Sequence, residues 1–163
     1  MLKISKTDNR LKEKGKEDIK KIRTELKKDP IVLKMFKKYK VDISKIDNVP
    51  ISFDSDIDVS AKTVDGEIFL NSDMLYDDYK EYIHYVVHEL THVLQHITGK
   101  CNNGLNSDIE YLDIPSEIEA FKEQLKFKEK TDSKKEIGKY LKKLFDRHDL
   151  NRKERKKKIK ELL

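Results

Sequence analysis

Apolar side chains recur with helical spacing between Tyr79 and Gly99 and fall on one side of the helix that this spacing predicts. They are Tyr79, Ile83, Val86, Val87, Leu90, Val93, Leu94 and Ile97. The opposite side carries His84, Tyr85, His88, Glu89, His92 and His96. A helix facing solvent would place lysine and glutamate there, so the pattern predicts a core on one face and a polar cleft on the other.

The spacing of apolar residues changes to a period of two between residues 51 and 71, which predicts β-strands. Alternation runs through 51–53 and 57–64, and Asp65-Gly66 is a turn signal before the apolar stretch Glu67–Asn71. We expect two or three antiparallel strands with a hairpin at Asp65-Gly66. Such a sheet can pack on the following helix and offer an edge strand to an extended peptide.

The remaining segments favour helices. We expect them over 7–28, over 31–39, from Ser116 to Lys130 and twice within 131–163. The fold class is therefore predicted to be α+β: a small antiparallel sheet packed on the 79–99 helix and on the 116–130 helix. We assign residues 1–163 to a single domain with its core at about 50–130. Residues 1–49 and 131–163 are expected to be basic helical extensions.

Composition limits the class of protein. Of the 163 residues, 36% are hydrophobic and 41% are charged, so the core is modest. No apolar run is long enough to span a bilayer, and MLKISKTDNR lacks the apolar region of a signal peptide. The single cysteine, Cys101, excludes an intrachain disulfide and is expected to be a small buried residue. We expect a soluble cytoplasmic protein with no membrane partner.

Charge is distributed in three blocks. Residues 1–50 carry a net charge of +8, residues 51–120 carry −12, and residues 121–163 carry +9. The basic ends can bind nucleic acid or acidic partners, or they can pack against the acidic middle. We favour packing, because lysine and glutamate are interleaved in the basic blocks without aromatic residues between them.

The predicted 79–99 helix contains the motif His88-Glu89-Leu90-Thr91-His92. Histidines four residues apart lie one turn above each other, so both rings can reach a single ion. Glu89 can then face the open side of that ion and accept a proton from water. The spacing H-E-x-x-H is that of a zinc site that activates water, with one zinc ion per chain.

A catalytic zinc site has three protein ligands, so a third must lie outside this motif. A histidine six residues after His92 would supply it in one large class, but Thr98 occupies that position. Glu117 and Glu119 on the next predicted helix remain. Glu117 borders the apolar face and is our first choice, with Glu119 as the second. When a metal-activated water attacks a carbonyl group, the oxyanion that forms needs a hydrogen-bond donor besides the metal. The candidates for this donor are His84, His96, Tyr85 and Tyr111.

HELTH followed by the sequence E-I-E-A at residues 117–120 resembles the gluzincin class of zinc metallopeptidases. In that class a glutamate from a following helix joins the two histidines, and several families have alanine three residues after it, as Ala120 follows Glu117. Thermolysin-like enzymes have alanine directly after the ligand, which would match Glu119. Many relatives have aspartate four residues after the ligand, where this chain has Phe121. In size the chain resembles the minigluzincins, over about residues 50–130.

The resemblance implies a zinc metallopeptidase, expected to be an endopeptidase that cleaves a peptide or protein substrate. His88, His92 and Glu117 would hold the metal, and Glu89 would act as the general base. Opposite charges on the ends and the middle suggest that an end of the chain covers the cleft and keeps the enzyme latent. The alternative is a nucleic-acid or protein-binding module on a metallopeptidase-like scaffold, without turnover.

Overall fold

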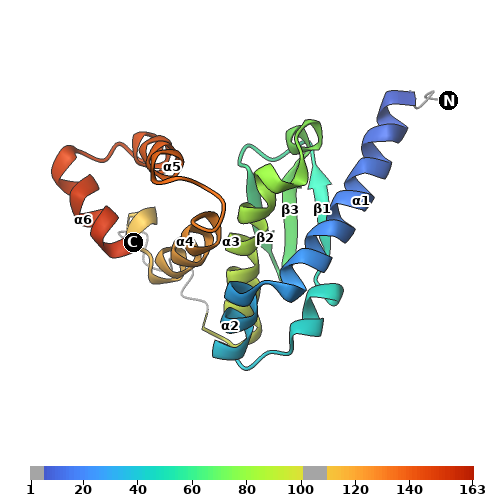
Figure 1. Ribbon diagram of the computed structural model, residues 1–163, viewed down its shortest axis with the longest axis horizontal. Coiled ribbons are helices and arrows are strands. Elements are labelled where there is room, and N and C mark those ends of the chain that lie inside the picture. Colours follow the sequence, from blue (N-terminus) through green and yellow to red (C-terminus); the bar gives the residue numbers. More distant parts are fainter. Residues whose placement is uncertain (1–5, 101–109) are drawn as a thin grey trace.

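A small sheet lies between helices in the computed structural model, which describes residues 6–100 and 110–163 (Figure 1). Cys101 lies outside these residues. The elements are the helices α1 (Lys6–Lys28), α2 (Pro30–Lys38), α3 (Tyr79–Ile97), α4 (Pro115–Lys128), α5 (Lys134–Arg147) and α6 (Arg152–Leu162), the strands β1 (Ile51–Asp54), β2 (Ala61–Val64) and β3 (Glu67–Asn71), and the short 3-10 helices η1 (Ile43–Asn48), η2 (Ser72–Tyr76) and η3 (Tyr111–Asp113). This architecture confirms the α+β class.

Local signals set the limits of the central helix. α3 begins after Asp78, whose side chain accepts a hydrogen bond from the Lys80 amide and so satisfies a free donor of the first turn. Thr98 ends the helix, and Gly99 follows with a φ of 70°, a backbone conformation that glycine adopts without steric cost. The helix expected over 79–99 is observed over Tyr79–Ile97, so its start is as predicted and it ends two residues earlier.

The sheet is mixed, with strand order β1-β3-β2. The predicted hairpin is confirmed, because β2 and β3 pair antiparallel around Asp65-Gly66. β1 pairs parallel with β3, so the prediction of a purely antiparallel sheet was wrong. The physical reason lies in β3, whose Ile68 and Leu70 are fully buried and make it the central strand. After β1 the chain forms the edge strand β2, and β3 then lies between β2 and β1.

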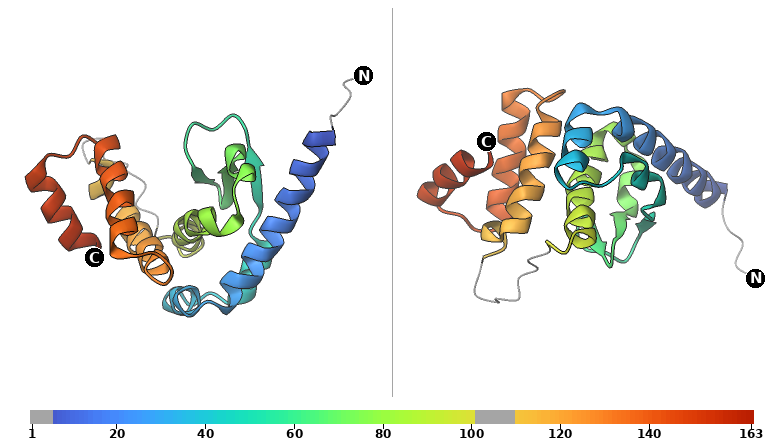
Figure 2. Two further views of the ribbon diagram at one scale, coloured as in Figure 1. Left: turned by 45° about the horizontal axis from the view of Figure 1, so that its top comes forward. Right: turned by 90° about the horizontal axis from the view of Figure 1, so that it is seen from below.

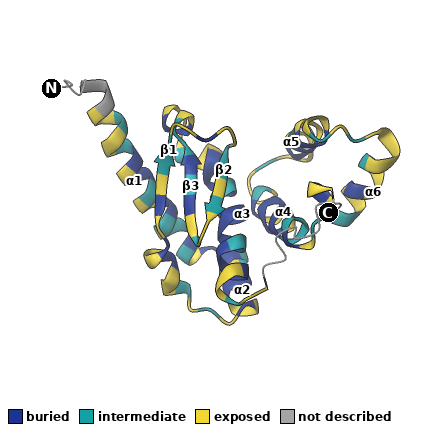
Figure 3. Cartoon of the chain, turned by 180° about the vertical axis from the view of Figure 1, so that it is seen from behind, coloured by how far each residue is buried: buried dark blue, intermediate teal, exposed yellow. Residues whose placement is uncertain are grey.

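Two clusters of buried apolar side chains stabilise the fold. The first joins α1, α2, the sheet and the apolar face of α3, and the second joins Leu112, α4, α5 and α6. α4 contributes to both, with Phe127 in the first and Phe121 and Leu125 in the second. Figure 2 shows α4, α5 and α6 on one side of α3 and the sheet with α1 on the other. Figure 3 shows how far α3 is buried between them. α3 and α4 therefore meet where the two clusters adjoin.

The N-terminal helices belong to the first cluster. Ile22 and Leu26 of α1 and Val32 of α2 are fully buried, so these helices supply core residues to the sheet and to α3. Residues 1–49, expected as an extension, thus take part in the core that supports α3.

Ion pairs join the basic ends to the acidic middle. Lys38 lies 2.9 Å from Glu119, and Lys158 lies 2.6 Å from Asp113 and donates to the Leu112 carbonyl at 2.8 Å. The Lys38 side chain is exposed, so its pair contributes little free energy, whereas the Lys158 side chain is buried. Both pairs bring opposite charge blocks into contact, as the packing interpretation expected. Among the described helices, none combines the length and apolar character needed to cross a bilayer.

Candidate metal centre

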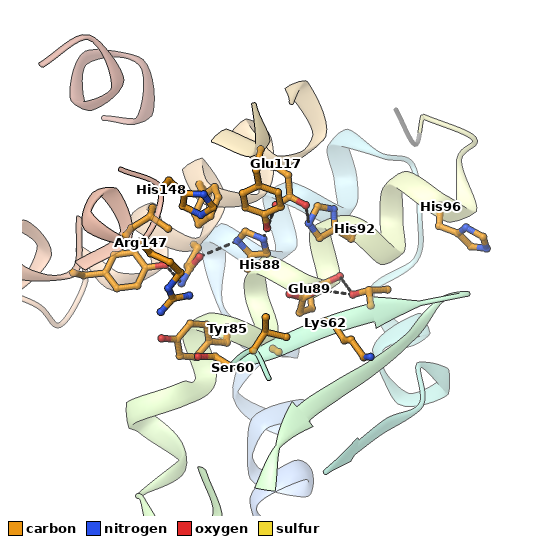
Figure 4. Close-up of a pocket in the computed structure, with 18 of the residues that line it drawn as sticks. Ser60, Lys62, Tyr85, His88, Glu89, His92, His96, Glu117, Arg147 and His148 are labelled. Atoms are coloured by element: carbon orange, nitrogen blue, oxygen red, sulfur yellow. Dashed lines mark hydrogen bonds and ion pairs between the residues drawn. The ribbon is translucent and has the colours of Figure 1, made fainter. Parts of the chain in front are cut away.

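Three side chains converge where α3 meets α4 (Figure 4). His88 and His92 stand one turn apart on α3, and Glu117 comes from the first turn of α4. Glu117 Oε2 lies 3.1 Å from His88 Nε2, and Glu117 Oε1 lies 3.0 Å from His92 Nε2. The start of a helix favours a carboxylate, because the backbone dipole is positive there.

These residues could hold one metal ion. One donor atom from each lies within 4.8 Å of the others. The donor atoms around a tetrahedral zinc ion stand roughly 3.4 Å apart when the bonds to the metal are roughly 2.0–2.2 Å long. The distances from Glu117 to the two histidines are 3.1 and 3.0 Å, and no two donor atoms of the group are more than 4.8 Å apart, so the spacing is close to that of a zinc site. Two imidazoles and one carboxylate are also a donor set that zinc prefers. The residues therefore fit the ion that the motif implies.

Two buried glutamines orient the histidines. His88 Nδ1 donates to Gln124 Oε1 at 2.9 Å, and His92 Nδ1 donates to Gln95 Oε1 at 2.8 Å. An amide oxygen only accepts, so each ring carries a proton on Nδ1 and directs Nε2 towards Glu117. A partner on the far nitrogen fixes both the tautomer and the direction of a metal-binding histidine. Phe121 packs edge-on against His88 with ring centroids 4.5 Å apart.

The Gln124 amide is itself fixed by a buried network. Its Nε2 donates to His84 Nδ1 at 2.7 Å and to the Tyr140 hydroxyl at 2.9 Å. Burial, with smaller contributions from the Lys128 charge and from His88, lowers the pKa of His84 to about 3, so the ring is neutral and its Nδ1 can accept. His84 thus lies behind Gln124 and does not line the pocket that contains the metal ligands.

The two kinds of ligand stabilise each other's charged forms. Burial alone would raise the pKa of Glu117, but hydrogen bonds and charge from His88 and His92 lower it well below its ordinary value. Burial alone would lower the pKa of His92, but the hydrogen bond and charge of Glu117 raise it to about 9. A cation is therefore favoured next to Glu117.

Glu89 faces a pocket of about 550 Å³ that also contains all three ligands. The Thr63 hydroxyl on β2 donates to Glu89 Oε2 at 2.6 Å. This bond links the edge strand to the carboxylate beside the histidines and restricts its rotation. The pocket extends along residues 59–63, which include the first three residues of β2, to Asp65 and Gly66.

Tyr111, Tyr85 and His96 all line this pocket, but only Tyr111 contacts a ligand residue. Its hydroxyl donates to Glu117 Oε2 at 2.8 Å, and its ring stacks on His148 with centroids 5.1 Å apart. Burial and the adjacent Glu117 charge raise the pKa of Tyr111, so the phenol keeps its proton. His96 lies at the far end, next to Gly66.

Glu119, the second choice for the third ligand, lies outside this cluster. It accepts hydrogen bonds from Lys38 at 2.9 Å and from the Tyr39 hydroxyl, and Gln95 Nε2 lies 3.4 Å from it. Glu119 therefore pairs mainly with Lys38 and Tyr39, and the carboxylate beside the histidine pair is that of Glu117.

Sequence reasoning missed Gln95, Gln124 and Thr63. The helical positions carried a signal for the glutamines, because Gln95 is one turn after His92 and Gln124 is two turns after Glu117. A search confined to ionisable residues passes over amides. Thr63 carried no such signal, since its contact with Glu89 depends on how the sheet packs on α3.

Comparisons with known proteins add no relative. No family model matches the chain, and no significant match was found among curated proteins or solved structures.

Replacing either glutamine by leucine is expected to weaken zinc binding. Gln95→Leu and Gln124→Leu keep similar side-chain volume but remove the acceptor that fixes the ring, which typically costs about 10–100-fold in metal affinity. Competition with a chromophoric chelator measures the change. Lys122→Ala, an exposed position on α4, is the control and should bind as tightly as wild type. Wild-type affinity in both glutamine variants would contradict the orienting role.

The pairing of His92 with Glu117 predicts a pH-dependent stability in chelator-treated protein. Because the folded pKa of His92 is raised to about 9, the pair stabilises the fold fully below the unfolded pKa of about 6.5 and loses this contribution as the pH rises through 9. Urea unfolding of wild type and His92→Gln should therefore show a difference in unfolding free energy that shrinks by roughly 1–3 kcal/mol between pH 6 and pH 10. A difference independent of pH would refute the pairing.

Proposed function

We propose that this chain is a zinc-dependent peptidase that uses His88, His92 and Glu117 to hold the metal and Glu89 as the general base. One observation carries the proposal: three zinc-type donor atoms and a separate carboxylate meet in one pocket that runs along an edge strand. The histidine tautomers, fixed by Gln95 and Gln124, support it further.

The number of ligands favours catalysis over a structural role. Structural zinc sites are normally closed by four protein ligands, whereas the group among the described residues has three. When bound, zinc would supply a Lewis acid for the scissile carbonyl and lower the pKa of a coordinated water to about 7. Glu89, which is no member of the ligand group, is then available for proton transfer.

The chain's own residues have separate tasks in this proposal. Glu89 accepts a proton from the attacking water and passes it to the leaving nitrogen. Thr63 holds the Glu89 carboxylate through its hydrogen bond at 2.6 Å. Tyr85 lines the pocket and is the better-placed hydroxyl donor for the developing oxyanion, because Tyr111 donates its proton to Glu117, His84 is engaged with Gln124 and His96 lies at the far end.

The substrate class follows from the edge of β2. A strand with one free edge can pair with an extended peptide through main-chain hydrogen bonds. The pocket follows this edge past the metal ligands from Val59 to Gly66, so it can accept chain on both sides of a cleaved bond. We therefore propose an endopeptidase. Latency through residues 131–163 stays a prediction; α5 supplies Tyr140, Leu144 and Arg147 to the pocket wall.

The alternative, a binding module without turnover, has less support. Its motivation was the basic charge of both ends, and several of these lysines contact acidic residues of the same chain, as Lys38 does with Glu119 and Lys158 with Asp113. A module of this kind would also have no use for the Glu89 carboxylate beside the ligand group.

Metal analysis of purified variants tests the ligand set. Wild type should take up one zinc ion per chain, and His88→Ala and Glu117→Ala should lose it, because each removes one of three ligands. Glu119→Ala is the matched control, two residues further along α4, and should retain zinc. Failure of the wild type to bind zinc after incubation with a zinc salt would refute the proposal. Loss of zinc in Glu119→Ala but not in Glu117→Ala would overturn the choice of ligand.

Glu89→Gln should retain zinc and lose at least about 100-fold in peptide hydrolysis, the usual scale of general acid–base catalysis. Cleavage of a fluorescently labelled casein and zinc content are measured on the same preparation. Glu67→Gln, an exposed position on β3, is the control for loss of a carboxylate. Turnover at the wild-type rate in Glu89→Gln would remove the general-base assignment.

A further inference from the structure

Arg147 is a cation at one end of the pocket, and its guanidinium has no ion-pair or hydrogen-bond partner within residues 6–100 and 110–163. It is the last residue of α5 and lines both the pocket of the metal ligands and a neighbouring pocket, which share Val59, Ser60 and Tyr85. Its guanidinium forms no hydrogen bond or ion pair with another described residue. The adjacent Asp146 pairs with Arg155 at 2.7 Å instead.

The end of α5 is fixed against the metal centre. His148, directly after Arg147, stacks on Tyr111, whose hydroxyl donates to Glu117. Tyr140, two turns earlier on α5, accepts a hydrogen bond from Gln124. Contacts on both sides of Arg147 therefore hold its backbone at the pocket, and Figure 4 shows the side chain on the α5 side of the site.

The direction of β2 relates Arg147 to the direction of a bound peptide. The Ser60 backbone carbonyl accepts a hydrogen bond from the Asn71 backbone N–H at 2.9 Å, and Lys62 of β2 pairs with Phe69 of β3. In an antiparallel ladder successive residues direct their backbone groups to opposite sides, so Ala61 and Thr63 present theirs to the outer edge. The strand begins at Ala61, next to Ser60, which lines both pockets together with Arg147. From there it runs towards Gly66 and His96.

A peptide paired antiparallel with this edge runs the opposite way. Its N-terminal part lies towards Gly66 and His96, and its C-terminal part lies towards Ser60 and Arg147. Glu89 and the metal ligands lie between these ends, as the close-up in Figure 4 shows with His96 on one side and Arg147 on the other. Antiparallel pairing is the more stable of the two arrangements.

We propose that Arg147 binds a carboxylate of the substrate on the C-terminal side of the cleaved bond. The proposal rests on the peptidase function above and adds a substrate class to it. A guanidinium presents a fork of donors that matches a carboxylate with two hydrogen bonds. The carboxylate is supplied either by an aspartate or glutamate side chain or by the free C-terminus of a short peptide.

Acidic side chains surround Arg147, so its charge determines whether a substrate carboxylate is attracted or repelled at this end of the pocket. The neighbouring pocket is also lined by Asp58, Asp73, Asp77 and Glu81. Without the arginine, an incoming carboxylate would meet these carboxylates alone and be repelled. Removal of Arg147 should therefore turn a preference for acidic residues into a preference against them.

Cleavage-site profiling tests the proposal. A proteome-derived peptide library is digested with zinc-loaded wild type, Arg147→Ala and Arg147→Glu, and the cut sites are identified by mass spectrometry. Wild type should cut with Asp or Glu enriched within three residues after the cut bond. Arg147→Ala should cut such sites about tenfold less efficiently, the scale of one hydrogen bond to a charged group, while cuts at neutral sites persist. Arg147→Glu should shift the preference to Lys or Arg.

Lys143→Ala is the matched control, because it removes an exposed cation one turn earlier on α5 outside the pocket. It should keep the wild-type profile. Identical profiles for wild type and Arg147→Ala would overturn the proposal, and enrichment of acidic residues only before the cut bond would overturn the assigned side. For the best substrate, replacing the acidic side chain by its amide and amidating the C-terminus are compared, and the change that reduces cleavage identifies the source of the carboxylate.

A retention experiment separates this proposal from the peptidase function. If wild type cleaves no more than Glu89→Gln, the peptidase proposal fails. Immobilised Glu89→Gln and Glu89→Gln/Arg147→Ala proteins are then exposed to the same library, and the retained peptides are sequenced. Retention of acidic peptides by the first protein only would still support carboxylate binding by Arg147. Equal retention by both would overturn it.

Discussion

The arrangement depends on one partly buried interaction, the carboxylate of Glu117 between the imidazoles of His88 and His92. A carboxylate away from water needs positive charge or hydrogen bonds nearby, and two histidines one turn apart supply both. This requirement fixes where the first turn of α4 must lie against the middle of α3. The remaining contacts of the site, from Gln95 and Gln124 to Tyr111, hold these three groups in place.

The sequence predicted those parts of the site that are local to one helix. His88, Glu89 and His92 lie within five residues, so helical geometry alone places them together. Glu117 is 29 positions after His88, and only the apolar face of its helix favoured it over Glu119. The two glutamines that orient the histidine rings were not predicted. A group in this role only has to accept a hydrogen bond and need not be charged, and a glutamine in a helix does not otherwise indicate a functional site.

Prediction of the fold stopped where periodicity stops being informative. Alternation identifies a strand but is the same for parallel and antiparallel neighbours, so β1 was assigned the wrong direction. The alternation also predicted a second strand from residue 57, whereas β2 begins at Ala61. Ile57 is buried in the connection before β2, where its backbone carbonyl accepts a hydrogen bond from the Asn71 side chain at 3.0 Å. The helices were predicted closely, since caps at Asp78 and Asn151 are local signals.

The two apolar clusters have a consequence for cooperativity. α3 is anchored in one cluster, and the N-terminal part of α4 that carries Glu117 packs with the other. An ion shared by His88, His92 and Glu117 would therefore act as a non-covalent cross-link between the two clusters, which α4 also joins through Phe127. Its binding free energy would be added to their interface, so that melting of the C-terminal helices and release of the metal become a single event.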